Sequence, residues 1–150
     1  MTRGGPLLSC VEVEPEGSAN AAVIWLHGLG ADGHDFEPIV PYLELAPRIQ
    51  ARFVFPHAPN RPVTVNAGMV MPAWYDIRML ALQREIDEGG VLESTEQVAA
   101  LMARERDRGM APGRLVLAGF SQGGAIALHA ALRYPERLAG VIALSTYLVR

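Results

Sequence analysis

The stretch that most constrains the fold of this chain is residues 114–124, RLVLAGFSQGG. A short β-prone run leads into Gly119-Phe-Ser-Gln-Gly123, and an Ala-rich apolar segment of helical length comes next, over 124–132. A serine between such a strand and helix sits on a strained bend that lifts its hydroxyl above the sheet. The flanking glycines are required because strand and helix pass too closely for a Cβ atom. We interpret the stretch as a nucleophile elbow with Ser121 as nucleophile. The alternative is a glycine-rich turn with an idle serine.

Apolar runs with strand character alternate with helical segments along the rest of the chain. Between these, residues 57–76 are rich in Pro, Asn and Gly, so we expect a long ordered loop there. Residues 36–49 have near-helical spacing, but Pro38 and Pro41 should confine any helix to the residues after these prolines. The alternation predicts an α/β fold, with a mostly parallel sheet flanked by helices, in a single domain 1–150. Strands are expected at 7–13, 21–26, 52–55, 115–117 and 138–145, and helices at about 94–108 and 124–132.

Composition and charge exclude several classes of partner. The net charge is −3, and basic residues form no run that would bind nucleic acid or an anionic membrane. No signal peptide precedes the first strand, and no stretch approaches the length of a membrane span. We therefore expect a cytoplasmic protein without stable membrane association. The one cysteine, Cys10, excludes an intrachain disulfide and is expected to be buried and inert.

Attack by Ser121 on an acyl carbon creates an oxyanion, which needs two preformed N–H donors. One is the backbone N–H of Gln122, directly after the nucleophile. The other must come from a loop after an earlier strand, and residues 27–30, His-Gly-Leu-Gly, come directly after the apolar run 21–26. Glycines on both sides of Leu29 let its peptide group turn inward. We therefore predict Leu29 and Gln122 as the oxyanion pair, with no role required of the Gln122 side chain.

The same loop spells Gly28-Leu-Gly-Ala-Asp-Gly33, the spacing of a dinucleotide-binding fingerprint. Two prolines, at 38 and 41, fall where the helix of such a unit would begin, and the next strand lacks a subsequent acidic residue to hold a ribose. A nucleotide-binding oxidoreductase therefore remains a minor alternative. No cofactor is predicted, and no His/Cys cluster has the spacing of metal ligands.

Four histidines and one aspartate are candidate partners of the serine. We expect His27 to brace the oxyanion loop by hydrogen bonding rather than to act as base. His129 should point at the core or a neighbouring element, and His34 and His57 should be hydrogen-bonded or solvated loop residues. Asp76 precedes the serine, against the usual chain order of a triad, so a structural hydrogen bond is expected there.

Aromatic and methionine side chains gather in the segment before the first expected helix. Trp74 and Met71, with nearby Met69 and Tyr75, either line a substrate groove or form a lid of core packing. The sequence leaves both interpretations open. If the side chains line a substrate groove, Trp74 and Met71 contact the substrate.

Five segments of the chain match a known pattern in the same order: LHGLGADG at 26–33, RPVTVN at 61–66, MPAWYDI at 71–77, GFSQGG at 119–124 and LSTYL at 144–148. Together they resemble the small bacterial carboxylesterases related to acyl-protein thioesterases and lysophospholipases. The resemblance spans nearly all of the chain from about Val23. It implies an α/β-hydrolase that cleaves a small acyl ester or thioester in the cytoplasm without a cofactor. It carries over Ser121 as nucleophile, Leu29 and Gln122 as the oxyanion pair, and Trp74 near the acyl site. Ala67 stands where close relatives often have glycine.

The chain differs from that family in length. The family's catalytic Asp and His would lie beyond Arg150, so the resemblance implies an α/β-hydrolase that is incomplete at its C-terminal side. We therefore expect the 150-residue chain to hydrolyse esters poorly, because loss of the base from such a triad costs about 10⁶-fold in kcat. Without neighbouring strands, residues 138–144 would leave an exposed apolar edge that favours self-association or a homodimer. The alternative function is a non-catalytic α/β module that binds acyl ligands or a protein partner.

Overall fold

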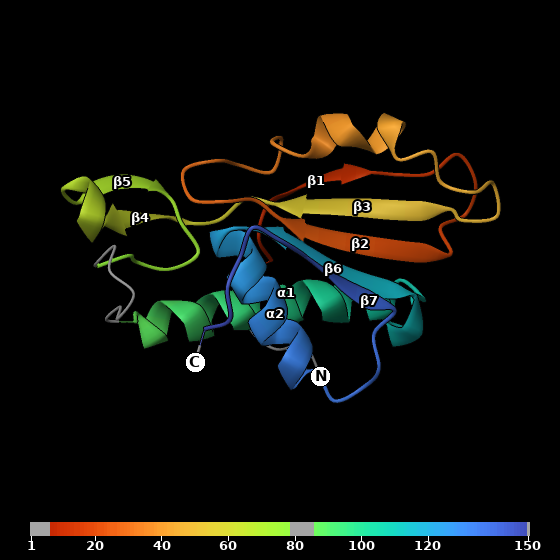
Figure 1. The fold of residues 1–150 in the computed structure, drawn as a ribbon. Coiled ribbons are helices and arrows are strands. Elements are labelled where there is room, and N and C mark those ends of the chain that lie inside the picture. Colours follow the sequence, from red (N-terminus) through yellow and green to blue (C-terminus); the bar gives the residue numbers. More distant parts are fainter. Residues whose placement is uncertain (1–6, 79–85, 150) are drawn as a thin grey trace.

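The computed structural model describes residues 7–78 and 86–149. Its main sheet has five strands in the order β1-β3-β2-β6-β7 (Figure 1). Neighbouring strands are parallel except β1, which runs antiparallel to β3. The mostly parallel α/β sheet predicted from the sequence is therefore confirmed. The strands are β1 (Cys10–Val13), β2 (Ala21–Leu26), β3 (Ala51–Pro56), β6 (Leu115–Phe120) and β7 (Gly140–Leu144).

The central strands are buried on both faces, which explains their continuous apolar runs. Successive side chains of β2 point to opposite faces, so Ile24 and Leu26 join one apolar cluster while Trp25 joins the other. The first cluster lies under two helices, α1 (Glu88–Asp107) and α2 (Gln122–Arg133). The second is covered by the short 3₁₀ helix η1 (Glu37–Tyr42). Figure 1 shows the two α-helices on one side of the sheet and η1 on the other.

Helix α1 begins six residues earlier than the sequence indicated, at Glu88 instead of about Ser94. The carboxylate of Asp87 accepts a hydrogen bond from the backbone N–H of Gly90, which caps the first turn. A Cβ atom on Gly90 would overlap the Asp87 carboxylate, so a larger residue at this helical position would displace the capping side chain. The helix ends after Asp107, with basic residues in its last turn as expected.

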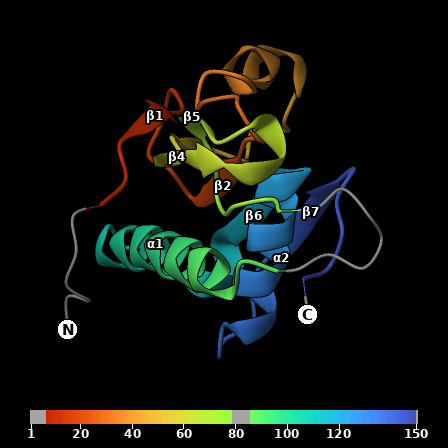
Figure 2. The ribbon, with the colours of Figure 1, turned by 90° about the vertical axis from the view of Figure 1, so that its left-hand side faces the viewer.

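The segment expected to be a long loop contains a small hairpin. Its strands are β4 (Asn60–Val63) and β5 (Met69–Pro72), joined through the 3₁₀ turn η2 (Thr64–Asn66) and two residues with positive φ, Ala67 and Gly68. Figure 1 shows the hairpin beyond the carboxyl ends of β2 and β3, and Figure 2 looks onto this end of the sheet. The hairpin therefore lies on the side where the loops after the parallel strands emerge.

Any helix in residues 36–49 was expected to lie after Pro38 and Pro41, and this position was wrong. A helix does not begin after the two prolines; η1 contains them both, with Pro38 in its first turn and Pro41 inside. A 3₁₀ helix of this length leaves its first N–H groups unpaired in any case, so the missing donor of Pro38 costs little.

Within residues 7–78 and 86–149, no helix combines the length and the apolarity that crossing a membrane requires.

Candidate active site

The turn between β6 and α2 has the strained geometry that the sequence predicts. Ser121 adopts φ 52° and ψ −117°, a conformation that costs a residue with a side chain about 1–3 kcal/mol. Three hydrogen bonds hold it there. Its N–H donates to the Leu144 carbonyl at 2.9 Å, and its own carbonyl accepts from the Ala125 N–H at 3.1 Å and the Thr146 hydroxyl at 2.6 Å. The Ser121 hydroxyl does not cap α2, which leaves it available for chemistry.

The glycines around Ser121 are required by close backbone contacts. A Cβ atom on Gly119 would lie 2.5 Å from the Gly123 carbonyl oxygen. A Cβ atom on Gly123 would lie 2.5 Å from the Leu26 carbonyl oxygen and closer still to that of His27. Both positions therefore exclude a side chain, and α2 packs directly onto the carboxyl end of β2.

Replacing Gly123 with alanine is expected to destabilise the fold, because two carbonyl groups must move to admit one methyl group. Overpacking of this kind costs about 1–3 kcal/mol, which corresponds to a fall in Tm of about 2–4 °C for each kcal/mol in a chain of this size. Thermal melting of Gly123→Ala measures this fall in Tm. Gly113→Ala is the matched control, since a Cβ atom there meets nothing within 4 Å. Equal melting temperatures for the two variants would contradict the packing account.

The predicted oxyanion loop lies against the elbow. β2 and β6 are paired so that Leu26 is opposite Gly119, and the loop 27–33 therefore emerges beside Ser121. A Cβ atom on Gly28 would lie 3.0 Å from the Phe120 ring. Gly30, at φ +77°, donates its N–H to the Pro72 carbonyl at 2.9 Å. The chain thus brings the Leu29 loop and the start of α2 together, while their roles as oxyanion donors stay a prediction.

His27 braces this loop, as expected. Its Nε2 accepts the Ala58 N–H at 3.0 Å, which assigns the proton to Nδ1, and Nδ1 donates to the Gly28 carbonyl at 2.7 Å. The ring is 2% exposed, and burial lowers its pKa. His27 is therefore a neutral side chain with both nitrogens engaged, which is unsuited to deprotonating Ser121.

The structure places Trp74 in the core instead of a groove. Its side chain is 0% exposed, and its indole N–H donates to the His27 carbonyl at 2.8 Å. The ring therefore supports the loop after β2 by packing and by this hydrogen bond, and its contact with substrate stays a prediction. Met71 is half-buried, and its sulfur would lie 3.8 Å from a Cβ atom on Gly30. Of the two predicted substrate contacts, only Met71 is partly exposed, and its contact with substrate stays a prediction.

The side chain of Gln122 was not expected to contribute. It is 1% exposed, accepts the Trp74 N–H through Oε1 and donates to the Tyr75 carbonyl through Nε2, both at 2.7 Å. The sequence signal was a polar residue at the head of a helix whose first two turns are otherwise Gly and apolar residues. Because its partners are backbone groups 47 and 48 residues away, pattern reasoning could not have found them.

The remaining candidates have structural partners. His129 bonds to the Thr95 hydroxyl at 2.9 Å, and burial and the nearby Arg133 lower its pKa. Asp76 accepts from both the backbone and the hydroxyl of Thr64. Burial raises the pKa of Asp76, but these bonds and the charge of Arg78 outweigh it and hold the pKa below its usual value. His57 accepts the Gly33 N–H at 3.0 Å, and exposed His34 lies 3.4 Å from Glu37. No hydrogen bond joins a histidine to Ser121 in the part of the chain that the structure describes.

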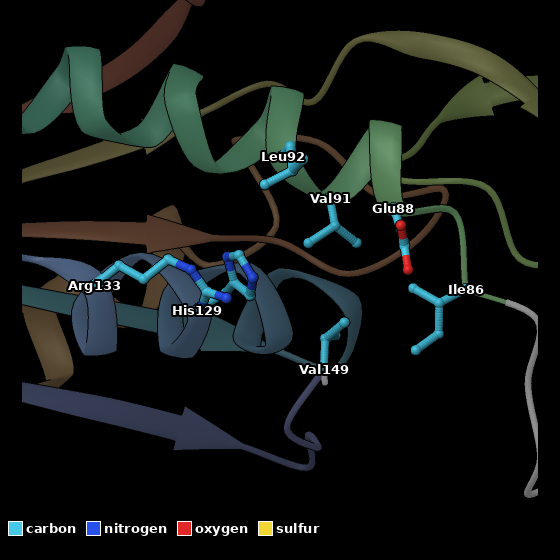
Figure 3. Close-up of a pocket in the computed structure, with 7 residues that line it drawn as sticks. All are labelled: Ile86, Glu88, Val91, Leu92, His129, Arg133 and Val149. Atoms are coloured by element: carbon cyan, nitrogen blue, oxygen red, sulfur yellow. The ribbon is translucent and has the colours of Figure 1, made fainter.

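A cavity of about 230 Å³ lies between α1 and α2 (Figure 3). None of the predicted site residues lines it. Its apolar lining comes from α1 and from residues outside the two helices, whereas α2 contributes His129 and Arg133, and no residue of the elbow lines it. Its lining residues are Ile86, Glu88, Val91, Leu92, His129, Arg133 and Val149. Across residues 7–78 and 86–149, no group of His, Cys, Asp and Glu could hold a metal ion.

The chain is similar to known proteins over most of its length. The model of the family described as phospholipase/carboxylesterase matches residues 9–150. The chain is 42% identical over 144 residues to acyl-protein thioesterase 1 of Cryptococcus neoformans, a match that covers 93% of this chain and 60% of the relative. It is 44% identical over 135 residues to acyl-protein thioesterase 1 of Neurospora crassa, covering 86% and 55%. The chain thus spans about 55–60% of the length of these curated relatives.

Solved structures share the fold. The Arabidopsis thaliana protein SOBER1 superposes with a TM-score of 0.81 at 38% identity, covering 86% of this chain and 62% of that one. Acyl-protein thioesterase 2 of Zea mays superposes with a TM-score of 0.78 at 30% identity, covering 93% and 62%.

Proposed function

Because this chain belongs to the phospholipase/carboxylesterase family of α/β-hydrolases, we propose that it is a serine hydrolase that cleaves carboxylic esters or thioesters through an acyl-enzyme on Ser121. The observation that carries the proposal is the strained conformation of Ser121 at the junction of β6 and α2. Strain of this kind persists only where surrounding bonds enforce it, and it is concentrated at functional sites. Here the strained residue is Ser121, and its hydroxyl makes no capping hydrogen bond to its own helix, α2.

The proposed reaction has two steps. The Ser121 hydroxyl attacks the acyl carbon as a base removes its proton, and the carbonyl oxygen becomes an oxyanion. The N–H groups of Leu29 and Gln122 stabilise that charge, and the positive end of α2 adds to their effect. Collapse of the intermediate forms the Ser121 acyl ester and releases the alcohol or thiol, which takes the proton back from the base. Water then attacks the acyl ester in the same way and releases the acid.

The base is proposed to come from outside residues 1–150. The chain has four histidines, and each has a hydrogen-bond or ion-pair partner other than Ser121. The match covers 62% of the related structures, so a third or more of their length has no counterpart here. We place the base and its orienting acid in that remaining part of the family fold.

A fluorophosphonate probe tests the proposal, because phosphonylation requires a hydroxyl activated by its surroundings. We expect the polypeptide that the gene encodes to be labelled at Ser121. Peptide mass spectrometry identifies the residue that carries the label. Ser121→Ala should abolish labelling, and Ser18→Ala, a change at an exposed serine, should leave it unchanged. Absence of label from the unmodified protein would overturn the proposal in favour of a non-catalytic module that binds acyl ligands.

A further inference from the structure

We propose that the side chain of Gln122 is a positioning group that sets the two oxyanion donors relative to each other, through residues 72–75. The inference rests on the proposed function, because it concerns the same site. It gives the Gln122 side chain a task distinct from that of its own backbone N–H. The amide holds the segment 72–75 to the head of α2, and that segment in turn holds the Leu29 loop.

The first half of the link is the bidentate contact of the Gln122 amide. Oε1 accepts the Trp74 N–H and Nε2 donates to the Tyr75 carbonyl, each at 2.7 Å. The two bonds use opposite ends of the amide group on successive residues of one segment, so the side chain cannot rotate without breaking both. With 1% exposure, water cannot replace either partner.

The second half joins the same segment to the oxyanion loop. The Pro72 carbonyl accepts the Gly30 N–H at 2.9 Å, directly after Leu29. The Trp74 indole N–H donates to the His27 carbonyl at 2.8 Å, directly before Gly28. The loop is therefore bonded to the segment on both sides of the Leu29 peptide. The Ser94 hydroxyl donates to the Trp74 carbonyl and fixes the segment to α1.

Such a link matters because an oxyanion hole works by preorganisation. Donors must face the position that the oxyanion will occupy before the reaction begins, and loss of one donor costs about 10²–10³-fold in kcat. A misplacement of about 1 Å can cost about 10²-fold. The loop after β2 and the start of α2 each supply one donor, and the segment 72–75 is hydrogen-bonded to both.

Two substitutions distinguish positioning from bulk packing. Gln122→Met keeps similar volume and removes both hydrogen bonds at every pH. Gln122→Glu behaves differently in its two protonation states. The neutral acid has one acceptor and one donor, like the amide, whereas the carboxylate has two acceptors and repels the Tyr75 carbonyl. Burial favours the neutral form and raises the pKa of such a carboxyl group.

The assay uses the whole polypeptide that the gene encodes and a p-nitrophenyl short-chain ester. For Gln122→Met we expect kcat to fall about 10- to 100-fold, with KM within about threefold, because the lost interaction acts in the transition state. For Gln122→Glu the ratio of its kcat to that of the unmodified protein should rise as pH falls. Gln97→Met and Gln97→Glu, on the half-buried middle of α1, are the matched controls and should show neither effect.

Hydrogen exchange provides a readout that does not depend on activity. The Trp74 amide should be protected in the unmodified protein and should exchange faster in Gln122→Met, measured by NMR at a temperature where both are folded. Faster exchange with unchanged kcat would overturn the positioning role while leaving the proposed hydrolase intact. Unchanged exchange would overturn the link itself. A protein without Ser121-dependent hydrolysis would remove the proposed function, and with it the catalytic meaning of the link.

Discussion

Replacing Ser121 with alanine is expected to lower kcat for ester hydrolysis by about 10⁶-fold in the polypeptide that the gene encodes, the loss found when a serine hydrolase is deprived of its nucleophile. The physical reason is that alanine removes the only atom at this position that can bond to the acyl carbon, while the oxyanion donors and the surrounding contacts remain. Steady-state kinetics with a p-nitrophenyl short-chain ester measures the change.

The same variant should remain folded, because the three hydrogen bonds that hold residue 121 use its backbone and not its hydroxyl. Alanine is strained at φ 52° in the same way as serine. A melting temperature close to that of the unmodified protein would therefore accompany the loss of activity. A variant that keeps more than about one part in a hundred of the original kcat would show that another residue is the nucleophile.

The second large effect concerns the base. A polypeptide of residues 1–150 alone should hydrolyse the same ester about 10⁶-fold more slowly than a longer product of the gene that supplies a histidine partner, since loss of the base costs as much as loss of the nucleophile. The reason is local. Within 1–150, His27 is neutral with both ring nitrogens bonded, and His129 is bonded to Thr95 on the helical side of the sheet.

The two polypeptides are compared under the same conditions, each beside its Ser121→Ala variant. Equal rates that depend on Ser121 in both would contradict the account and place the base among the four histidines of residues 1–150. His27→Gln would then identify it or exclude it, because His27 directly succeeds the strand beside the elbow.

The features that the sequence predicted correctly depend on local rules. The turn at Ser121 is dictated by glycines at which a Cβ atom would clash, and the strand before it by a continuous apolar run. The position of the Leu29 loop is predictable as well, because the carboxyl ends of neighbouring parallel strands meet at one edge. The bracing role of His27 results from its place at the end of a buried strand, where a polar ring must find partners.

The features that the sequence did not predict depend on contacts between distant segments or on caps that override propensity. Helix α1 starts at Glu88 because the Asp87 side chain caps its first turn. That turn contains two glycines, which helix propensity alone would place outside a helix. For Trp74 the sequence left a substrate groove and core packing both open, and only the structure shows that its indole N–H bonds to the His27 carbonyl within the core. The bonds of the Gln122 side chain join residues almost fifty positions apart. No periodicity or motif encodes such a pairing.

The most direct test of the central claim is a crystal structure of the phosphonate adduct of the polypeptide that the gene encodes. The claim is that Ser121 carries the acyl group while Leu29 and Gln122 hold its oxygen. We predict phosphorus bonded to the Ser121 Oγ, with one phosphonyl oxygen within about 3.1 Å of the backbone nitrogens of both Leu29 and Gln122. An adduct on another residue, or an oxygen directed away from these two nitrogens, would contradict it.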